Sequence, residues 1–233
     1  MSAAAGHLLA QIEAGLRAQG LELLGAFHPL PDDGVPAQPD GRACGTLILA
    51  GNIGGSLWPY FSAAPEASDG RPDPLDRWSA RVIGALAEVA GGRALFPFGE
   101  PPYLPFQRWA KRGAPLAASP LGMLIHPDFG LWHAYRGAVA LAEALPLPPA
   151  AARTSPCDAC ADKPCLAACP VGAFTAAGYD VAACAGHVAA PAGSDCLGLG
   201  CRARRACPLG RAHHYPAAQA RFHMSAFLAA RNS

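Results

Sequence analysis

Eight of the nine cysteines in this 233-residue chain lie between residues 157 and 208. The first run reads Cys157-x2-Cys160-x4-Cys165-x3-Cys169-Pro170. After an isolated Cys184, the second run reads Cys196-x4-Cys201-x5-Cys207-Pro208. Thiolates grouped in this way bind iron–sulfur clusters, and in the bacterial two-cluster pattern C-x2-C-x2-C-x3-C-P the last cysteine of a run binds the other cluster. The spacing therefore predicts two [4Fe–4S] clusters.

In each predicted cluster, one ligand is the last cysteine of the other run. We expect the first to be bound by Cys157, Cys160, Cys165 and Cys207. We expect the second to be bound by Cys169, Cys184, Cys196 and Cys201. The first run has four residues where two are usual, and Cys184 is detached, so a single cluster, zinc and disulfides stay open as alternatives. Zinc favours paired CxxC knuckles, of which the chain has one, and disulfides need an oxidising compartment.

Other residues near the cysteines have weaker signals. Cys44 lies outside both runs and is expected to be a small buried hydrophobe. Four arginines surround the last cysteines, as candidates to raise a cluster potential or to dock an acidic electron donor, or as a solvated loop: Arg202, Arg204, Arg205 and Arg211.

Composition and charge indicate two units in one chain. The sequence is 52% hydrophobic with a net charge of +1, so nothing global favours nucleic acid. Residues 151–233 carry eight Lys/Arg against four Asp, a net charge of +4, whereas residues 1–150 carry −3. We therefore expect one domain over 1–150 and a second over 151–233. The start of the chain does not resemble a signal peptide and no apolar run is long enough to span a membrane, so we expect a cytoplasmic protein.

Hydrophobic periodicity and turn residues predict alternating helices and strands. Helices are expected over 3–19, 73–90, 104–112 and 215–230, and strands over 21–28, 46–50, 94–98 and 121–126. Residues 131–145 fit either type, and 146–156 read as a linker. The glycine-rich stretch 51–55 matches neither phosphate-binding fingerprint, so a tight turn is favoured over a phosphate site.

One stretch resembles a known family. Residues 121–139 read LGMLIHPDFGLWHAYRGAV, which resembles the IHP-x-FG-x-W-x-A-x-RG core of the cobalamin-processing family of methylmalonic aciduria and homocystinuria type C (cblC). The upstream stretch TLILAGNIGGSLWPYF and the triplet Phe106-Gln107-Arg108 are similar to further segments of that family. The likeness spans roughly residues 43–140.

The cysteine region resembles a second, related group. The segment KPCLAACPVGAF and the detached cysteine are similar to epoxyqueuosine reductase and the reductive dehalogenases, which join a corrinoid-binding, nitroreductase-like domain to a two-cluster ferredoxin module. The resemblance implies an α+β fold: a nitroreductase-like or cblC-like mixed-sheet domain followed by a small ferredoxin-like domain. This chain is shorter than epoxyqueuosine reductase, and that family's catalytic acid has no evident match.

The resemblance also implies residue roles. Arg136 matches an arginine of the cblC upper-ligand pocket and is the candidate catalytic residue. Phe106, Gln107 and Arg108 match residues near the corrin. His126 is a candidate cobalt ligand or a structural turn histidine, and Trp132 a candidate stacking residue or part of the core.

Together these features predict an iron–sulfur oxidoreductase that binds cobalamin and delivers electrons to its cobalt, for reduction, removal of the upper ligand, or corrinoid-dependent reduction of another substrate. A low-potential flavodoxin or ferredoxin is the expected donor. The alternatives are a ferredoxin-type electron carrier, an FMN-dependent reductase and a cobalamin chaperone without catalytic activity.

Overall fold

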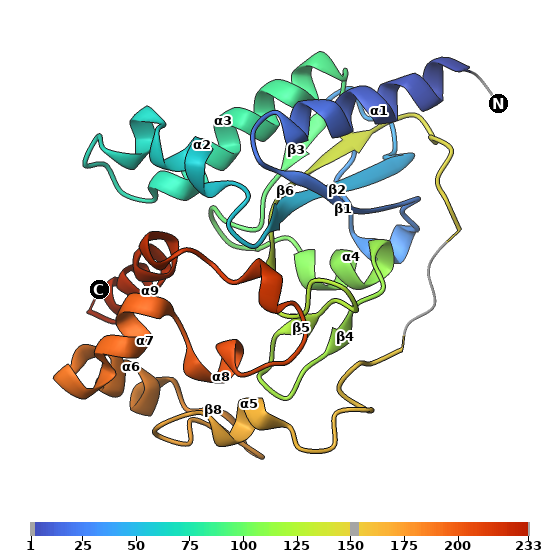
Figure 1. The fold of residues 1–233 in the computed structure, drawn as a ribbon. Helices are drawn as coiled ribbons and strands as arrows, with labels where there is room; N and C mark the ends of the chain where they lie inside the picture. Colours follow the sequence, from blue (N-terminus) through green and yellow to red (C-terminus); the bar gives the residue numbers. More distant parts are fainter. Residues whose placement is uncertain (1–2, 150–153, 233) are drawn as a thin grey trace. The chain divides into compact units, whose positions relative to one another are not determined.

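The computed structural model describes residues 3–149 and 154–232, which combine helices with small sheets (Figure 1). The chain divides into two compact units. Unit 1 comprises Met1–Pro115 and Ala134–Ala152, and unit 2 comprises Leu116–His133 and Arg153–Ser233. The mixed α+β class predicted from the sequence is confirmed.

A four-stranded sheet, in the order β1-β2-β6-β3, is the centre of unit 1. Its strands are β1 (Glu22–Phe27), β2 (Thr46–Ile53), β6 (His133–Leu141) and β3 (Arg93–Leu95). Strand β1 pairs antiparallel with β2, and β3 pairs antiparallel with β6. All but the last residue of β2 are buried, as expected for a strand with both faces covered.

Helices cover both faces of this sheet. Figure 1 shows α1 (Ala3–Arg17) and α3 (Pro74–Val89) on one side and α4 (Phe106–Gly113) on the other, while the short α2 (Trp58–Ser62) precedes α3. Side chains alternate along a strand, so Leu47 and Leu49 point to the α4 side, where they form a buried cluster with Trp109.

Most predicted elements of unit 1 are present with shifted ends. The ambiguous stretch 131–145 is the strand β6, because its apolar residues pair with β3 and are buried on both faces. In unit 2, the strand predicted over 121–126 is reduced to β5 (Leu124–Ile125), which pairs with β4 (Ala117–Ala118). Residues 51–53 extend β2, and the turn begins only at Gly54.

Unit 2 consists of short elements and one long helix. Besides β4 and β5, they are α5 (Pro164–Ala167), β7 (Phe174–Thr175), β8 (Gly178–Tyr179), α6 (Val181–Ala189), α7 (Ser194–Leu199), α8 (Arg202–Arg205) and α9 (Ala217–Asn232). The side chain of Asp180 caps α6 by accepting the backbone N–H of Ala183 at 2.9 Å. Helix α9 packs against α6 and α7.

The structure places the boundary between the units differently from the sequence prediction of 1–150 and 151–233. Leu116–His133 belongs to the cysteine-rich unit and not to the unit that precedes it in the chain. Two glycines allow residues 129–130 to approach residues 209–210 closely. Gly130 lies against the backbone of Leu209, and Gly210 lies against the backbone of Phe129. Both have a positive φ, and a Cβ at either position would overlap a carbonyl oxygen.

Over residues 3–149 and 154–232, the length and hydropathy of the helices rule each of them out as a membrane span.

Candidate functional site

The structure separates the eight clustered cysteines into two quartets, each lining its own cavity in unit 2. The first quartet, Cys157, Cys160, Cys165 and Cys207, lines a cavity of about 290 Å³. The second quartet, Cys169, Cys184, Cys196 and Cys201, lines a cavity of about 160 Å³. These are the two sets that the spacing predicts.

Local structure brings distant cysteines together in the first quartet. Cys157 and Cys160 lie in one turn, in which the N–H of Cys160 donates to the carbonyl of Cys157. Cys165 lies on α5. Helix α5 packs against α8, which precedes Cys207. Cys165 and Cys207 are buried in an apolar cluster with Ile125 and Leu131, so the inner side of the cavity is shielded from water.

The second quartet is drawn from four separate elements. Cys184 lies on α6 and Cys196 on α7, and Cys201 is the residue that precedes α8. Cys169 follows α5, and its Sγ accepts the backbone N–H of Ala173 at 3.3 Å. Because α6 and α7 pack against each other, the detached Cys184 of the sequence reaches the same cavity as the later cysteines.

The thiols within each quartet are close enough to affect one another's ionisation. Burial raises the pKa of Cys157, and the neighbouring Cys207, Cys165 and Cys160 raise it further. Burial raises the pKa of Cys184, and Cys169 and Cys196 add to that shift, whereas a hydrogen bond from Tyr179 opposes it. All nine cysteines are free thiols.

Four thiols around a cavity fit a polynuclear group. Within the described parts of the chain, no three His, Cys, Asp or Glu side chains converge where one metal ion would sit. In a [4Fe–4S] cluster each cysteine binds a different iron, so the four sulfurs surround an inorganic core and do not meet at one ion. The two cavities, each lined by four thiols and otherwise by mainly apolar groups, match that requirement.

Cys44 lies apart from both quartets. It is half-buried against the core of unit 1, and its Sγ donates to the carbonyl of Thr46 at 3.2 Å. Burial raises its pKa to about 11, so it remains a protonated thiol at neutral pH. This agrees with its expected role as a small hydrophobe.

The residues predicted to contact a corrinoid divide between the two units. Phe106, Gln107, Arg108 and Arg136 belong to unit 1, and His126 and Trp132 to unit 2. The structure thus brings the first four into one unit and the other two into another.

Within unit 1 these residues differ in exposure. Phe106 is buried in the core, with its ring centroid 4.9 Å from that of Trp109. Gln107 is exposed, and Arg108 donates to the carbonyl of Asp33 at 3.1 Å. Arg136 is half-buried, and its charge opposes the raised pKa that burial gives the carboxyl of Asp76.

The side chain of His126 stabilises a turn in unit 2. Its Nδ1 accepts the backbone N–H of Asp128 at 3.1 Å, and its ring stacks on Phe129 at 4.2 Å between centroids. Burial lowers the pKa of His126. One ring nitrogen is therefore already engaged in holding the turn that precedes Gly130.

The four arginines near the last cysteines have different surroundings. Arg205 and Arg202 both pair with the carboxylate of Asp195, the latter at 3.7 Å. Arg204 instead donates to the carbonyl of Leu131. Only Arg211 is exposed with no ion pair among the described residues, so the proposed docking surface for an acidic donor is reduced to Arg211 and the outer part of Arg202.

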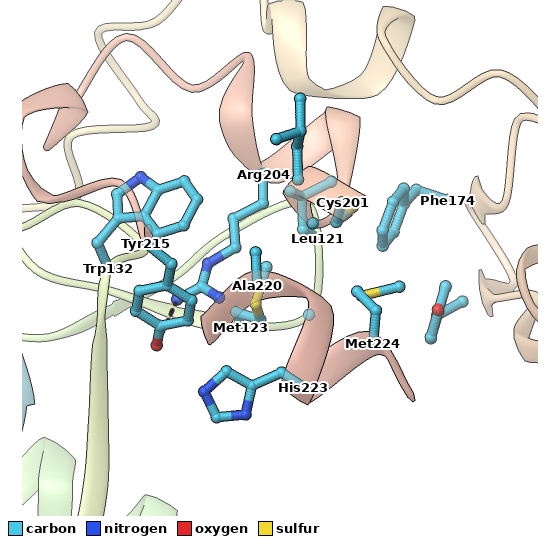
Figure 2. Close-up of a pocket in the computed structure, with 14 residues that line it drawn as sticks. Leu121, Met123, Trp132, Phe174, Cys201, Arg204, Tyr215, Ala220, His223 and Met224 are labelled. Carbon is cyan, nitrogen blue, oxygen red and sulfur yellow. Dashed lines mark hydrogen bonds between the residues drawn. The ribbon is translucent and has the colours of Figure 1, made fainter. Parts of the chain in front are cut away.

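A third cavity in unit 2 was not predicted from the sequence. This apolar pocket of about 420 Å³ is lined by residues of four segments, among them Met123, Trp132, Phe174, Cys201, Arg204, Tyr215 and Met224. Figure 2 shows Arg204 beside Trp132 and Tyr215, with Met224 and Phe174 farther along the same pocket. No periodicity or motif links these segments, so no sequence signal was available to find it.

Comparison with protein-family models and with curated protein sequences gives no match for this chain.

Proposed function

We propose that this protein is a two-cluster iron–sulfur redox protein that delivers electrons to the cobalt of a bound corrinoid. The observation that carries the proposal is the division of eight cysteines into two quartets around separate cavities. When bound, [4Fe–4S] clusters supply one-electron chemistry at potentials that extend to very low values.

The sulfurs of the two quartets accept different sets of hydrogen bonds from the chain. Sulfurs of the second quartet accept the N–H of Ala173, the phenol of Tyr179 and the backbone N–H groups of Ala203 and Arg204. For the first quartet, the hydrogen bonds to sulfur include the backbone N–H of Leu166 on Cys165. Hydrogen bonds to cluster sulfurs stabilise the more negative, reduced state, so we expect the second quartet to hold the cluster of higher potential.

The corrinoid part of the proposal is supported by the motif at residues 125–137 and by the half-buried guanidinium of Arg136. An arginine in such a place can bind a carboxylate of a large polar ligand by two parallel hydrogen bonds, or donate to an amide oxygen of that ligand. A low-potential flavodoxin or ferredoxin is the proposed donor, and Arg211 and Arg202 offer positive charge to it.

The experiment is to purify the protein without oxygen, reduce it, and record the visible spectrum before and after adding cob(II)alamin. We expect the absorption of the added cobalamin to shift. We expect Arg136→Lys to weaken binding about tenfold, the cost of one charge-assisted contact, while the exposed Arg17→Lys leaves it unchanged.

Other results would redirect the assignment. Clusters present without any change in the cobalamin spectrum would contradict the corrinoid part and leave a ferredoxin-type electron carrier. A flavin that copurifies in stoichiometric amount would favour an FMN-dependent reductase.

A further inference from the structure

We propose that the apolar pocket of unit 2 binds a quinone: a planar, uncharged aromatic ring that has carbonyl oxygens on its edge. This goes beyond the proposed function, because it adds a second ligand site. The pocket of about 420 Å³ lies within the size range of small-molecule sites, and a corrin macrocycle with its side chains is too large for it.

The shape and chemistry of the walls favour a flat apolar body. Met123, Met224 and Phe174 form one part of the lining, and Trp132 and Tyr215 form another (Figure 2). Methionine sulfurs and aromatic faces both pack well against conjugated rings.

The polar atoms of the pocket favour oxygen acceptors on the ligand. Its lining offers the N–H groups of Arg204, the hydroxyl of Tyr215 and the imidazole of His223, and includes no carboxylate. Donors outnumber acceptors, which suits carbonyl oxygens.

Arg204 is fixed in place as the principal donor. Its Nε and Nη2 donate to the carbonyl of Leu131 at 3.0 and 2.6 Å, and Nη2 also donates to the hydroxyl of Tyr215 at 3.2 Å, which leaves Nη1 for a ligand oxygen. The guanidinium lies 4.2 Å from the Trp132 ring centroid and 4.6 Å from that of Tyr215. It forms no ion pair within the described residues. A positioned guanidinium loses little rotamer freedom when it binds a ligand oxygen.

Two features favour a quinone over a flavin nucleotide or an organic anion. Arg204 is the only arginine or lysine among the lining residues, so the pocket offers a single permanent positive charge to a phosphate. Cys201 lines both this pocket and the cavity of the second quartet, so the thiolates of that quartet would repel a ligand anion.

Because Cys201 lines both cavities, a ligand in this pocket would lie next to the second quartet, where a redox-active ligand could exchange electrons. A quinone takes up two electrons and two protons to become a hydroquinone. The low-potential donor of the proposed function supplies the electrons, and water supplies the protons.

The test is binding of menadione, a 1,4-naphthoquinone, to the full-length protein loaded with iron, measured by equilibrium dialysis without oxygen. We expect Leu199→Trp to weaken binding at least about tenfold, because Leu199 is 48% exposed at the pocket and a larger side chain would fill the space. Leu30→Trp is the matched control, since Leu30 is an exposed leucine of unit 1 that does not line the pocket. Arg204→Lys, which keeps the charge and removes the forked donor, should weaken menadione binding as well.

Comparison ligands and iron content make the result decisive. Equal affinity for 2-methylnaphthalene, which lacks the carbonyl oxygens, would overturn the proposal, as would tighter binding of FMN or unchanged binding in Leu199→Trp. Full iron content without menadione binding would remove this inference and leave the proposed function intact. Menadione binding to protein that never acquires iron would support this inference and contradict the proposed function.

Discussion

At the scale of single residues, the assignment of cysteines to quartets can be tested by pairs of substitutions. Cys157→Ser with Cys207→Ser removes two ligands of the first quartet, so we expect about four of about eight irons to remain. Cys157→Ser with Cys196→Ser removes one ligand from each quartet, and we expect nearly all iron to be lost. Iron content per chain is the measurement.

Cys44→Ser is the control for those pairs, because Cys44 lies in unit 1 and lines neither cavity. It should retain all of the iron. Equal iron loss from both double variants would contradict the division into two quartets.

Tyr179 offers a second test at this scale. Its hydroxyl interacts with the Cys184 thiol of the second quartet. A hydrogen bond worth about 1 kcal/mol corresponds to roughly 40 mV for a one-electron couple. We expect Tyr179→Phe to lower one of two midpoint potentials by that order in a spectroelectrochemical titration, with the other unchanged. A shift of both potentials, or of neither, would contradict the assignment.

His133 makes a prediction about pH. Burial lowers its pKa from 6.5 to about 4, with further lowering from His126 and Arg204. Between these values the unfolded chain takes up a proton that the folded chain does not, so stability is full above about pH 6.5 and declines as the pH falls toward about pH 4.

As the pH is lowered from about 6.5 to about 4, the free energy of unfolding should therefore fall less steeply in His133→Gln than in the native chain. His7→Gln, which changes an exposed histidine of α1, should keep the native slope. Parallel slopes in the native chain and His133→Gln would show that this histidine does not titrate on unfolding.

At the scale of elements, the contact between two turns holds Leu116–His133 in unit 2. Gly210 has φ +73° and would place a Cβ against the carbonyl of Phe129, whereas Gly122 has φ +74° with open space around it. Both alanine variants are strained at positive φ, at a cost of about 1 kcal/mol, but Gly210→Ala also separates the two turns. We expect Gly210→Ala to lose at least about 2 kcal/mol more than Gly122→Ala in denaturant unfolding. Equal losses would mean that the turn contact contributes nothing.

Some of these features could be predicted from the sequence, and others could not. The two-cluster pattern, in which the last cysteine of each run binds the other cluster, predicted the same two sets of cysteines that line the cavities. Residues 131–145 could not be assigned because an apolar run fits a buried strand and a helix equally, and only pairing with β3 decides between them. The apolar pocket depends on the approach of residues 121–132 to residues 199–224, and such long-range contacts have no periodic signal.

At the scale of the whole molecule, unit 2 is discontinuous in sequence. The boundary predicted from charge and linker composition would separate Leu131 from Arg204 and Gly130 from Leu209. We therefore expect the fragment 151–233 to hold its iron less firmly than the full chain, with faster bleaching of cluster absorbance in air. A fragment as stable as the full chain would show that Leu116–His133 is dispensable.

The central claim, two four-iron clusters in one chain, is tested most directly by counting iron and acid-labile sulfide after purification without oxygen. We expect about eight irons and about eight sulfides per chain. Zinc in place of iron, or iron without sulfide, would contradict it.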